Sequence, residues 1–171
     1  MKVSILALLT VCALTFAARA EDVTAKISDV HLCCKKCVGL AEKAVATVHG
    51  AKAVADMDAG TVTITASDKT TAQKAADALV AKGFFGTSSD VTIDATTGAK
   101  DAKVKTIEIK DLHLCCDKCV KAVDKTVKAV PGVTGDTASK GATSFTVTGD
   151  FNDKDVMTAL QKEGLTGKVT E

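Results

Sequence analysis

Aromatic side chains are scarce in this chain of 171 residues. It has no tryptophan, no tyrosine and five phenylalanines. Phe16 lies in an N-terminal segment that we expect to be removed, which leaves four of the five. Because single-stranded nucleic acids bind largely by stacking their bases on exposed aromatic rings, the composition argues against such a partner.

An excess of positive charge is also missing. The 22 lysines and arginines nearly balance 21 aspartates and glutamates, for a net charge of +1. Removing Lys2 and Arg19 with the N-terminal segment takes this from +1 to −1. Proteins that bind phosphate backbones need a basic surface, so we expect no nucleic-acid partner. No phosphate-binding loop, nucleophile–base pair or pair of catalytic carboxylates stands out, and we do not expect an enzyme.

Long apolar runs are limited to the N-terminus, at residues 5–18. This run is shorter than a bilayer span usually requires. Lys2 precedes it and Ala18-Arg19-Ala20 follows it, as in a signal peptide with its cleavage site. We predict that residues 1–20 are a signal peptide and that the mature protein is secreted or periplasmic, without stable membrane insertion. The alternative is an uncleaved anchor.

The cysteines are clustered in two short segments of the sequence. Six of the seven cysteines lie in two copies of the block His-Leu-Cys-Cys-x-Lys-Cys, at residues 31–37 and 113–119. Such a repeat indicates one small module used twice. Clustered thiols indicate soft-metal or redox chemistry.

The flanking residues repeat as well. Apolar residues with helical spacing follow each block, and short alternating stretches come before it and after the helix. The order is strand, helix, strand, strand, helix, strand, with N-caps expected at Thr70 and Asn152 and last strands expected near Val91–Ile93 and Val169. We therefore predict an α+β protein of two tandem ferredoxin-like βαββαβ domains, each a four-stranded antiparallel sheet with two helices on one face. The expected bounds are 22–93 and 103–171, with a flexible linker at 94–102.

The two Cys-x-x-Cys pairs fall where the first loop of each module meets its first helix. The free N–H groups and positive dipole end of a helix start favour thiolate over thiol. An exposed pair of thiolates suits Cu(I), whereas Zn(II) prefers four ligands in a closed site. We expect Cu(I), one ion in each module, with Zn(II) or another soft metal as the alternative.

The remaining residues of the blocks leave alternatives open. Cys33 and Cys115 either supply a third sulfur, build a cluster or a metal shared between modules, or face away. A Cys34–Cys37 disulfide is permitted in an oxidising compartment, whereas a bridge between adjacent cysteines would be strained. His31 and His113 are either ligands or exposed loop histidines, and we expect the latter because it is the commoner case.

The blocks resemble the Met-x-Cys-x-x-Cys motif of the heavy-metal-associated domain family, which includes small copper chaperones and amino-terminal modules of metal ATPases. Leu32 and Leu114 stand where the family has methionine, and a cysteine fills the variable position. The resemblance implies a metal ion and a metal-transferring protein as partners, and Phe84 and Leu165 near the metal. The implied ligands are Cys34, Cys37, Cys116 and Cys119, with Cys33 and Cys115 as additional candidates.

Three functions remain in competition. The first is capture or transfer of a soft metal, which the spacing of the thiols favours. The second is thiol–disulfide exchange through Cys-x-x-Cys. The third is a structural or interaction module in which disulfides permanently staple the two domains.

Overall fold

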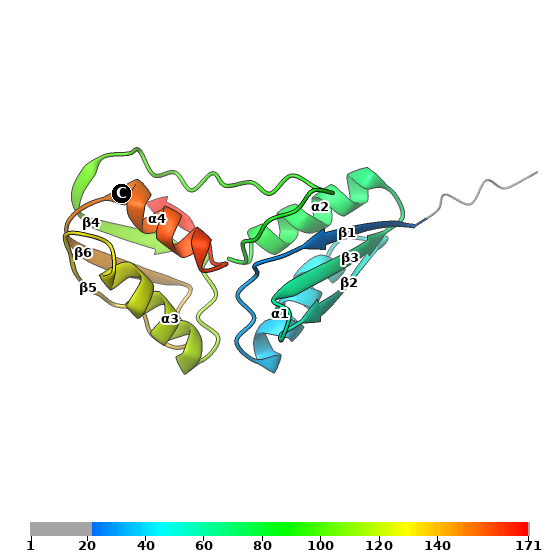
Figure 1. Ribbon diagram of the computed structural model, residues 1–171, viewed down its shortest axis with the longest axis horizontal. Coiled ribbons are helices and arrows are strands. Elements are labelled where there is room, and N and C mark those ends of the chain that lie inside the picture. The colour runs from blue at the N-terminus through cyan, green and yellow to red at the C-terminus, as the bar shows by residue number, and fades with distance from the viewer. Residues whose placement is uncertain (1–21, 171) are drawn as a thin grey trace, which may run out of the picture.

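The structure is a computed structural model that describes residues 22–170, and the predicted signal peptide at 1–20 lies outside that range. These residues form two α+β lobes joined by a long connection (Figure 1). Within the described range, none of the helices combines the length and the apolar character that crossing a bilayer requires.

The first lobe is an antiparallel sheet of three strands in the order β1-β3-β2, covered by two helices. Its core comes from strict alternation in β3, where Val62, Ile64 and Ala66 are buried. Both helices pack against this sheet and against each other. The bounds are β1 Val23–Ile27, α1 Lys35–Ala46, β2 Ala51–Asp56, β3 Thr61–Ala66 and α2 Lys69–Val80.

The second lobe has the complete ferredoxin-like sheet. Its four strands are antiparallel in the order β5-β6-β4-β7, so that the first and third strands of the repeat lie in the centre. The strand predicted at Val169 is present as β7. The bounds are β4 Lys103–Lys110, α3 Asp117–Lys128, β5 Val133–Asp136, β6 Ser144–Asn152, α4 Asp153–Lys162 and β7 Lys168–Thr170.

The prediction of a fourth strand at Val91–Ile93 in the first lobe is wrong. The free edge of β1 carries only an isolated bridge between Ser28 and Thr87. Farther along that edge, the backbone N–H of Lys26 donates to the Asp90 carboxylate at 2.9 Å, which takes the place of a strand partner. The Gln73 side-chain amide of α2 accepts a hydrogen bond from the N–H of Thr92 and donates one to its C=O. Side chains thus satisfy the backbone that a fourth strand would have paired.

The connection at residues 94–102 has no helix or strand, but hydrogen bonds fasten it to the second lobe. The buried Asp153 carboxylate accepts from the backbone N–H groups of Lys100 at 2.7 Å and Ala102 at 2.9 Å. The N–H of Val169 donates to the carbonyl of Thr97 at 2.7 Å. The segment predicted as a flexible linker is therefore held along the second lobe.

The two lobes meet through reciprocal backbone contacts. An isolated bridge pairs Phe84 with Leu165, and both side chains are fully buried. The N–H of Phe85 donates to the carbonyl of Gly164, and the N–H of Thr166 donates to the carbonyl of Gly83, both at 3.0 Å. The segment that follows the second helix of each lobe thus crosses to the other lobe. This pairing brings the two cysteine-bearing loops side by side in the middle of the molecule (Figure 1).

Candidate metal centre

Each cysteine-bearing loop leaves its strand through an aspartate in a left-handed conformation. Asp29 and Asp111 both have φ of 61°, a region that aspartate tolerates better than most residues. Each loop then enters a helix whose N-cap is a cysteine, Cys34 for α1 and Cys116 for α3. Neither N-cap side chain makes a capping hydrogen bond, so both sulfurs remain available.

The six sulfurs of the two blocks lie in one group rather than two. Within the blocks, Cys34 Sγ is 3.6 Å from Cys37 Sγ, and Cys116 Sγ is 3.8 Å from Cys119 Sγ. The two shortest contacts cross between the lobes and involve the additional cysteines. They join Cys37 to Cys115 at 3.1 Å and Cys33 to Cys119 at 3.3 Å, and Cys33 also lies 3.5 Å from Cys116.

Burial of the sulfurs differs from the exposed loop that the sequence led us to expect. Cys37, Cys115 and Cys119 are buried, and Cys33, Cys34 and Cys116 are half-buried. The expectation is wrong because each loop covers the other, which a single module does not do. All six are free thiols, and no disulfide joins cysteines within residues 22–170.

The thiols perturb one another's protonation. A hydrogen bond from the Cys119 thiol lowers the pKa of Cys37 and raises that of Cys119. Burial raises the pKa of Cys33 to about 12 and also raises the pKa of Cys115. Neighbouring negative charges disfavour one another, so the metal-free group carries only part of its possible charge. A bound cation allows the remaining thiols to ionise.

Two histidines flank the sulfurs, and neither is the exposed loop residue that we expected. His113 is buried, stacks on Phe84 with ring centroids 4.0 Å apart, and places Nδ1 3.2 Å from the carbonyl oxygen of Gly83. His31 has 11% of its side chain exposed and places Nδ1 3.7 Å from the Glu163 carboxylate. Burial, the largest influence, lowers the pKa of His31 despite the nearby Glu163. The Nε2 atoms of both rings are buried without a hydrogen-bond partner.

Each histidine lies within ligand distance of sulfurs from the two lobes. A ring nitrogen of His31 and the sulfurs of Cys33 and Cys119 all lie within 4.8 Å of one another. The same holds for His113 with Cys37 and Cys119. The donor set is soft thiolate with two imidazoles, which fits Cu(I) or Zn(II) better than Mg²⁺ or Ca²⁺. The side chains of Leu32 and Leu114, which precede the cysteines in the two blocks, are both buried.

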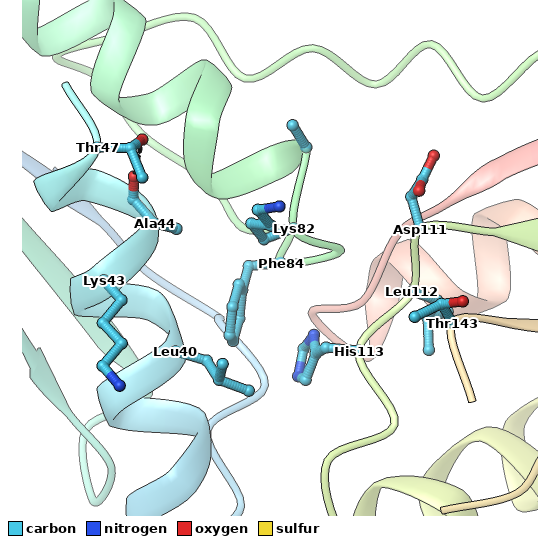
Figure 2. A pocket seen from close by; sticks show the side chains of 11 residues that line it. Leu40, Lys43, Ala44, Thr47, Lys82, Phe84, Asp111, Leu112, His113 and Thr143 are labelled. Atoms are coloured by element: carbon cyan, nitrogen blue, oxygen red, sulfur yellow. Dashed lines mark hydrogen bonds between the residues drawn. The ribbon is translucent and has the colours of Figure 1, made fainter. Parts of the chain in front are cut away.

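A separate cavity of about 320 Å³ lies between α1, the end of α2 and the loop at residues 111–113. Figure 2 shows Leu40 and Ala44 on one side of it and His113 on the other, next to Phe84. None of the six cysteines lines this cavity, so it is distinct from the metal centre and meets it only through His113.

No protein-family model matches the chain. No curated protein matches it either. The chain is similar to several solved structures at low identity, of which three follow. The N-terminal soluble domains of Bacillus subtilis CopA are 15% identical, with 88% of this chain and 95% of that one covered and a TM-score of 0.35. The apo HMA domain of a copper chaperone for superoxide dismutase is 18% identical, with 47% and 82% covered and a TM-score of 0.36. Oxidized MerP from Ralstonia metallidurans CH34 is 21% identical, with 41% and 100% covered and a TM-score of 0.35.

Proposed function

We propose that this protein is an exported metal-binding protein that captures or passes on Cu(I) through its cysteines. The observation that carries the proposal is the group of six free thiols whose sulfurs lie 3.1–3.9 Å from their neighbours. Sulfurs this close together gain from a cation, because it screens their mutual repulsion once they ionise.

Cu(I) is favoured over Zn(II) by the character and number of the donors. Thiolates are soft ligands that select Cu(I), and Cu(I) accepts two or three of them. A structural Zn(II) ion takes four ligands in a tetrahedron, which leaves sulfurs of this group unused. Zn(II) remains the second candidate because four of the thiolates, or three with an imidazole, also complete a tetrahedral set.

Uptake and release would begin at the half-buried N-cap thiols, Cys34 and Cys116. Burial raises the pKa of Cys116, but the nearby backbone N–H of Cys119 and the Cys33 thiol favour the thiolate, outweigh burial and bring the value to about 7. This sulfur is therefore partly thiolate at neutral pH and suited to meet an incoming ion. A partner protein that transfers metal would exchange thiolates with it one at a time.

Thiol–disulfide exchange is less well supported than binding. An exchange catalyst needs an accessible attacking thiolate and a resolving thiol close behind it. Cys37 and Cys119 are fully buried and sit among other sulfurs rather than beside a substrate groove. We therefore place the protein among binding proteins rather than enzymes.

Anaerobic titration of the reduced mature chain with Cu(I), in competition with a chromophoric chelator, tests the proposal. We expect tight binding that replacement of all six cysteines by serine abolishes. A parallel titration with Zn(II) decides between the two metals. The proposal fails if the fully reduced chain loses the competition for both ions. Export is checked separately, by sequencing the N-terminus of the protein recovered outside the cytoplasm, where we expect Glu21.

A further inference from the structure

The sulfur–sulfur distances are too short for two separate two-coordinate ions. With metal–sulfur bonds of about 2.3 Å, two sulfurs on one linear ion lie about 4.6 Å apart, and two on a trigonal ion about 4.0 Å apart. The Cys34–Cys37 and Cys116–Cys119 pairs are at 3.6 and 3.8 Å. Both pairs are well below the linear value, so an ion held by either pair needs at least a third ligand.

A third sulfur comes from the additional cysteines, and it comes from across the lobes. Cys33 Sγ lies 3.5 Å from Cys116 Sγ and 3.3 Å from Cys119 Sγ. Cys115 Sγ lies 3.9 Å from Cys34 Sγ and 3.1 Å from Cys37 Sγ. Each additional cysteine therefore stands beside both cysteines of the opposite pair and beside the second cysteine of its own pair. Every sulfur of the group has at least two neighbours.

Sulfurs with several neighbours can bridge metal ions. If four of the six thiolates each bridge two ions and two bind a single ion, they form about ten metal–sulfur bonds, and the imidazoles of His31 and His113 bring the total to about twelve, enough for about four Cu(I) ions with three bonds each. Such a cluster also neutralises most of the negative charge of the ionised group, because four monovalent cations offset four of the six thiolate charges.

The histidines have the hydrogen-bonding pattern of metal ligands. A carbonyl oxygen only accepts, so His113 Nδ1 must donate to Gly83, which leaves a lone pair on Nε2. His31 Nδ1 lies 3.7 Å from the Glu163 carboxylate, which is within ion-pair reach but beyond hydrogen-bond distance, so this acceptor orients the ring more weakly. Metal-bound imidazoles commonly donate their other N–H to a carbonyl or carboxylate, which fixes the tautomer. In both cases the partner belongs to the opposite lobe, and the buried Nε2 has no other partner.

We propose that the six cysteines, with His31 and His113, hold one polynuclear Cu(I) centre of about four ions between the lobes, instead of one ion in each lobe. This inference rests on the proposed function and adds the number of ions, the bridging role of Cys33 and Cys115 and the two imidazole ligands. The ions are the metal that the protein carries, and both lobes supply ligands to the same ions.

Native mass spectrometry of the reduced chain loaded with Cu(I) counts the ions, and X-ray absorption reports whether they lie next to one another. We expect about four ions per chain and a copper–copper scattering shell. In the Cys33→Ser/Cys115→Ser variant, which keeps both Cys-x-x-Cys pairs, the count should fall to about two or fewer, and that shell should disappear.

Nitrogen NMR of the histidine side chains tests the imidazoles in the unmodified chain, so it does not depend on a variant that folds. The chain has three histidines, and the exposed His49 is an internal control. On Cu(I) loading, the Nε2 signals of His31 and His113 should shift, and those of His49 should stay. The Nδ1 signals should remain those of a protonated nitrogen.

The outcomes separate the two proposals. No bound copper in the reduced chain contradicts the proposed function itself. Two isolated ions, equal in the chain and in the Cys33→Ser/Cys115→Ser variant, leave the proposed function standing and overturn the shared centre. A copper–copper shell with unmoved histidine signals overturns the role of the imidazoles.

Discussion

Gly83 and Gly164 are the residues on which the approach of the two lobes depends. Both have positive φ, at 81° and 77°, and each lies against the cysteine-bearing loop of the other lobe. A Cβ on Gly164 would lie 2.4 Å from both the carbonyl oxygen of Asp29 and the backbone nitrogen of His31. These neighbours are backbone atoms, which cannot move aside as a side chain can.

We predict that Gly164→Ala destabilises the folded protein and weakens Cu(I) binding at the same time. The positive φ alone should cost about 1 kcal/mol or more, and the clash should push the loop at residues 29–31 away from the second lobe. Thermal unfolding and Cu(I) competition measure the two effects.

Gly39→Ala is the matched control for that substitution. Gly39 lies in α1, two residues after Cys37, and a Cβ there has nothing within 4 Å. Because alanine is the better helix former, the control should gain about 0.5–1 kcal/mol in stability and bind Cu(I) unchanged. Equal behaviour of the two variants would show that contact between the lobes does not matter for binding.

At the scale of elements, periodic patterns in the sequence predicted the helices and most strands, and side-chain chemistry decided the exceptions. The helical spacing around Val45 and Val127 correctly predicted α1 and α3. Asn152 caps α4 as expected, but Asp68 rather than Thr70 caps α2, by accepting from the N–H of Thr71. The alternating pattern at Val91–Ile93 wrongly predicted a strand, because the Asp90 and Gln73 side chains bond the backbone groups that a strand would have paired. These bonds join residues far apart in the sequence, so local periodicity does not reveal them.

The connection between the lobes offers a prediction about stability and pH. Burial alone would raise the pKa of Asp153, but the backbone N–H groups of Lys100 and Ala102 outweigh it and lower the value. A carboxyl group whose pKa is lowered by folding stabilises the fold above its ordinary pKa, and this contribution disappears as the pH falls through the lowered value. Asp153→Asn should cost about 1–3 kcal/mol at neutral pH, since an amide cannot accept both bonds equally well.

Urea unfolding at neutral pH and at acid pH measures both parts of this prediction. The difference between the original chain and Asp153→Asn should narrow as the solution becomes acidic. Protease cleavage within residues 94–102 should also become faster in the variant. Asp150→Asn is a suitable control because its carboxylate is exposed and makes only a surface ion pair with Lys103. An effect of equal size in both variants would contradict the role given to Asp153.

At the scale of the whole molecule, the sequence predicted which cysteines belong together better than how they are arranged. The matching blocks pointed to all six cysteines, and a centre shared between modules was among the open alternatives. The sequence could not decide whether Cys33 and Cys115 face away or join a shared group. The contacts of Cys33 with Cys119 and of Cys37 with Cys115 depend on how the two lobes dock. The recurrence of His31 as His113 was the sequence signal that both imidazoles belong to the site. We expected them to be exposed because loop histidines usually are, but docking of the lobes buries His113 at the interface.

The same arrangement predicts the products of oxidation. Because the shortest sulfur–sulfur contacts join the lobes, treating the metal-free chain with a mild disulfide oxidant should form inter-lobe disulfides such as Cys37–Cys115 and Cys33–Cys119, besides bonds within each block. Each bond forms as two thiols of the chain pass two electrons and two protons to the oxidant disulfide, which leaves as two thiols. Peptide mapping identifies the pairs, and prior loading with Cu(I) should suppress them. Bonds confined to the individual blocks would contradict the docked arrangement.

Covalent attachment of the two lobes has a consequence for behaviour at low protein concentration. Two untethered modules would have to find each other by diffusion, so their joint affinity would fall as the sample is diluted. Here the connection keeps the halves at an effective concentration of the order of millimolar, whatever the bulk concentration. Docking of the two lobes in this chain should therefore be independent of dilution, so that ion retention at low protein concentration depends on the affinity for the ion alone.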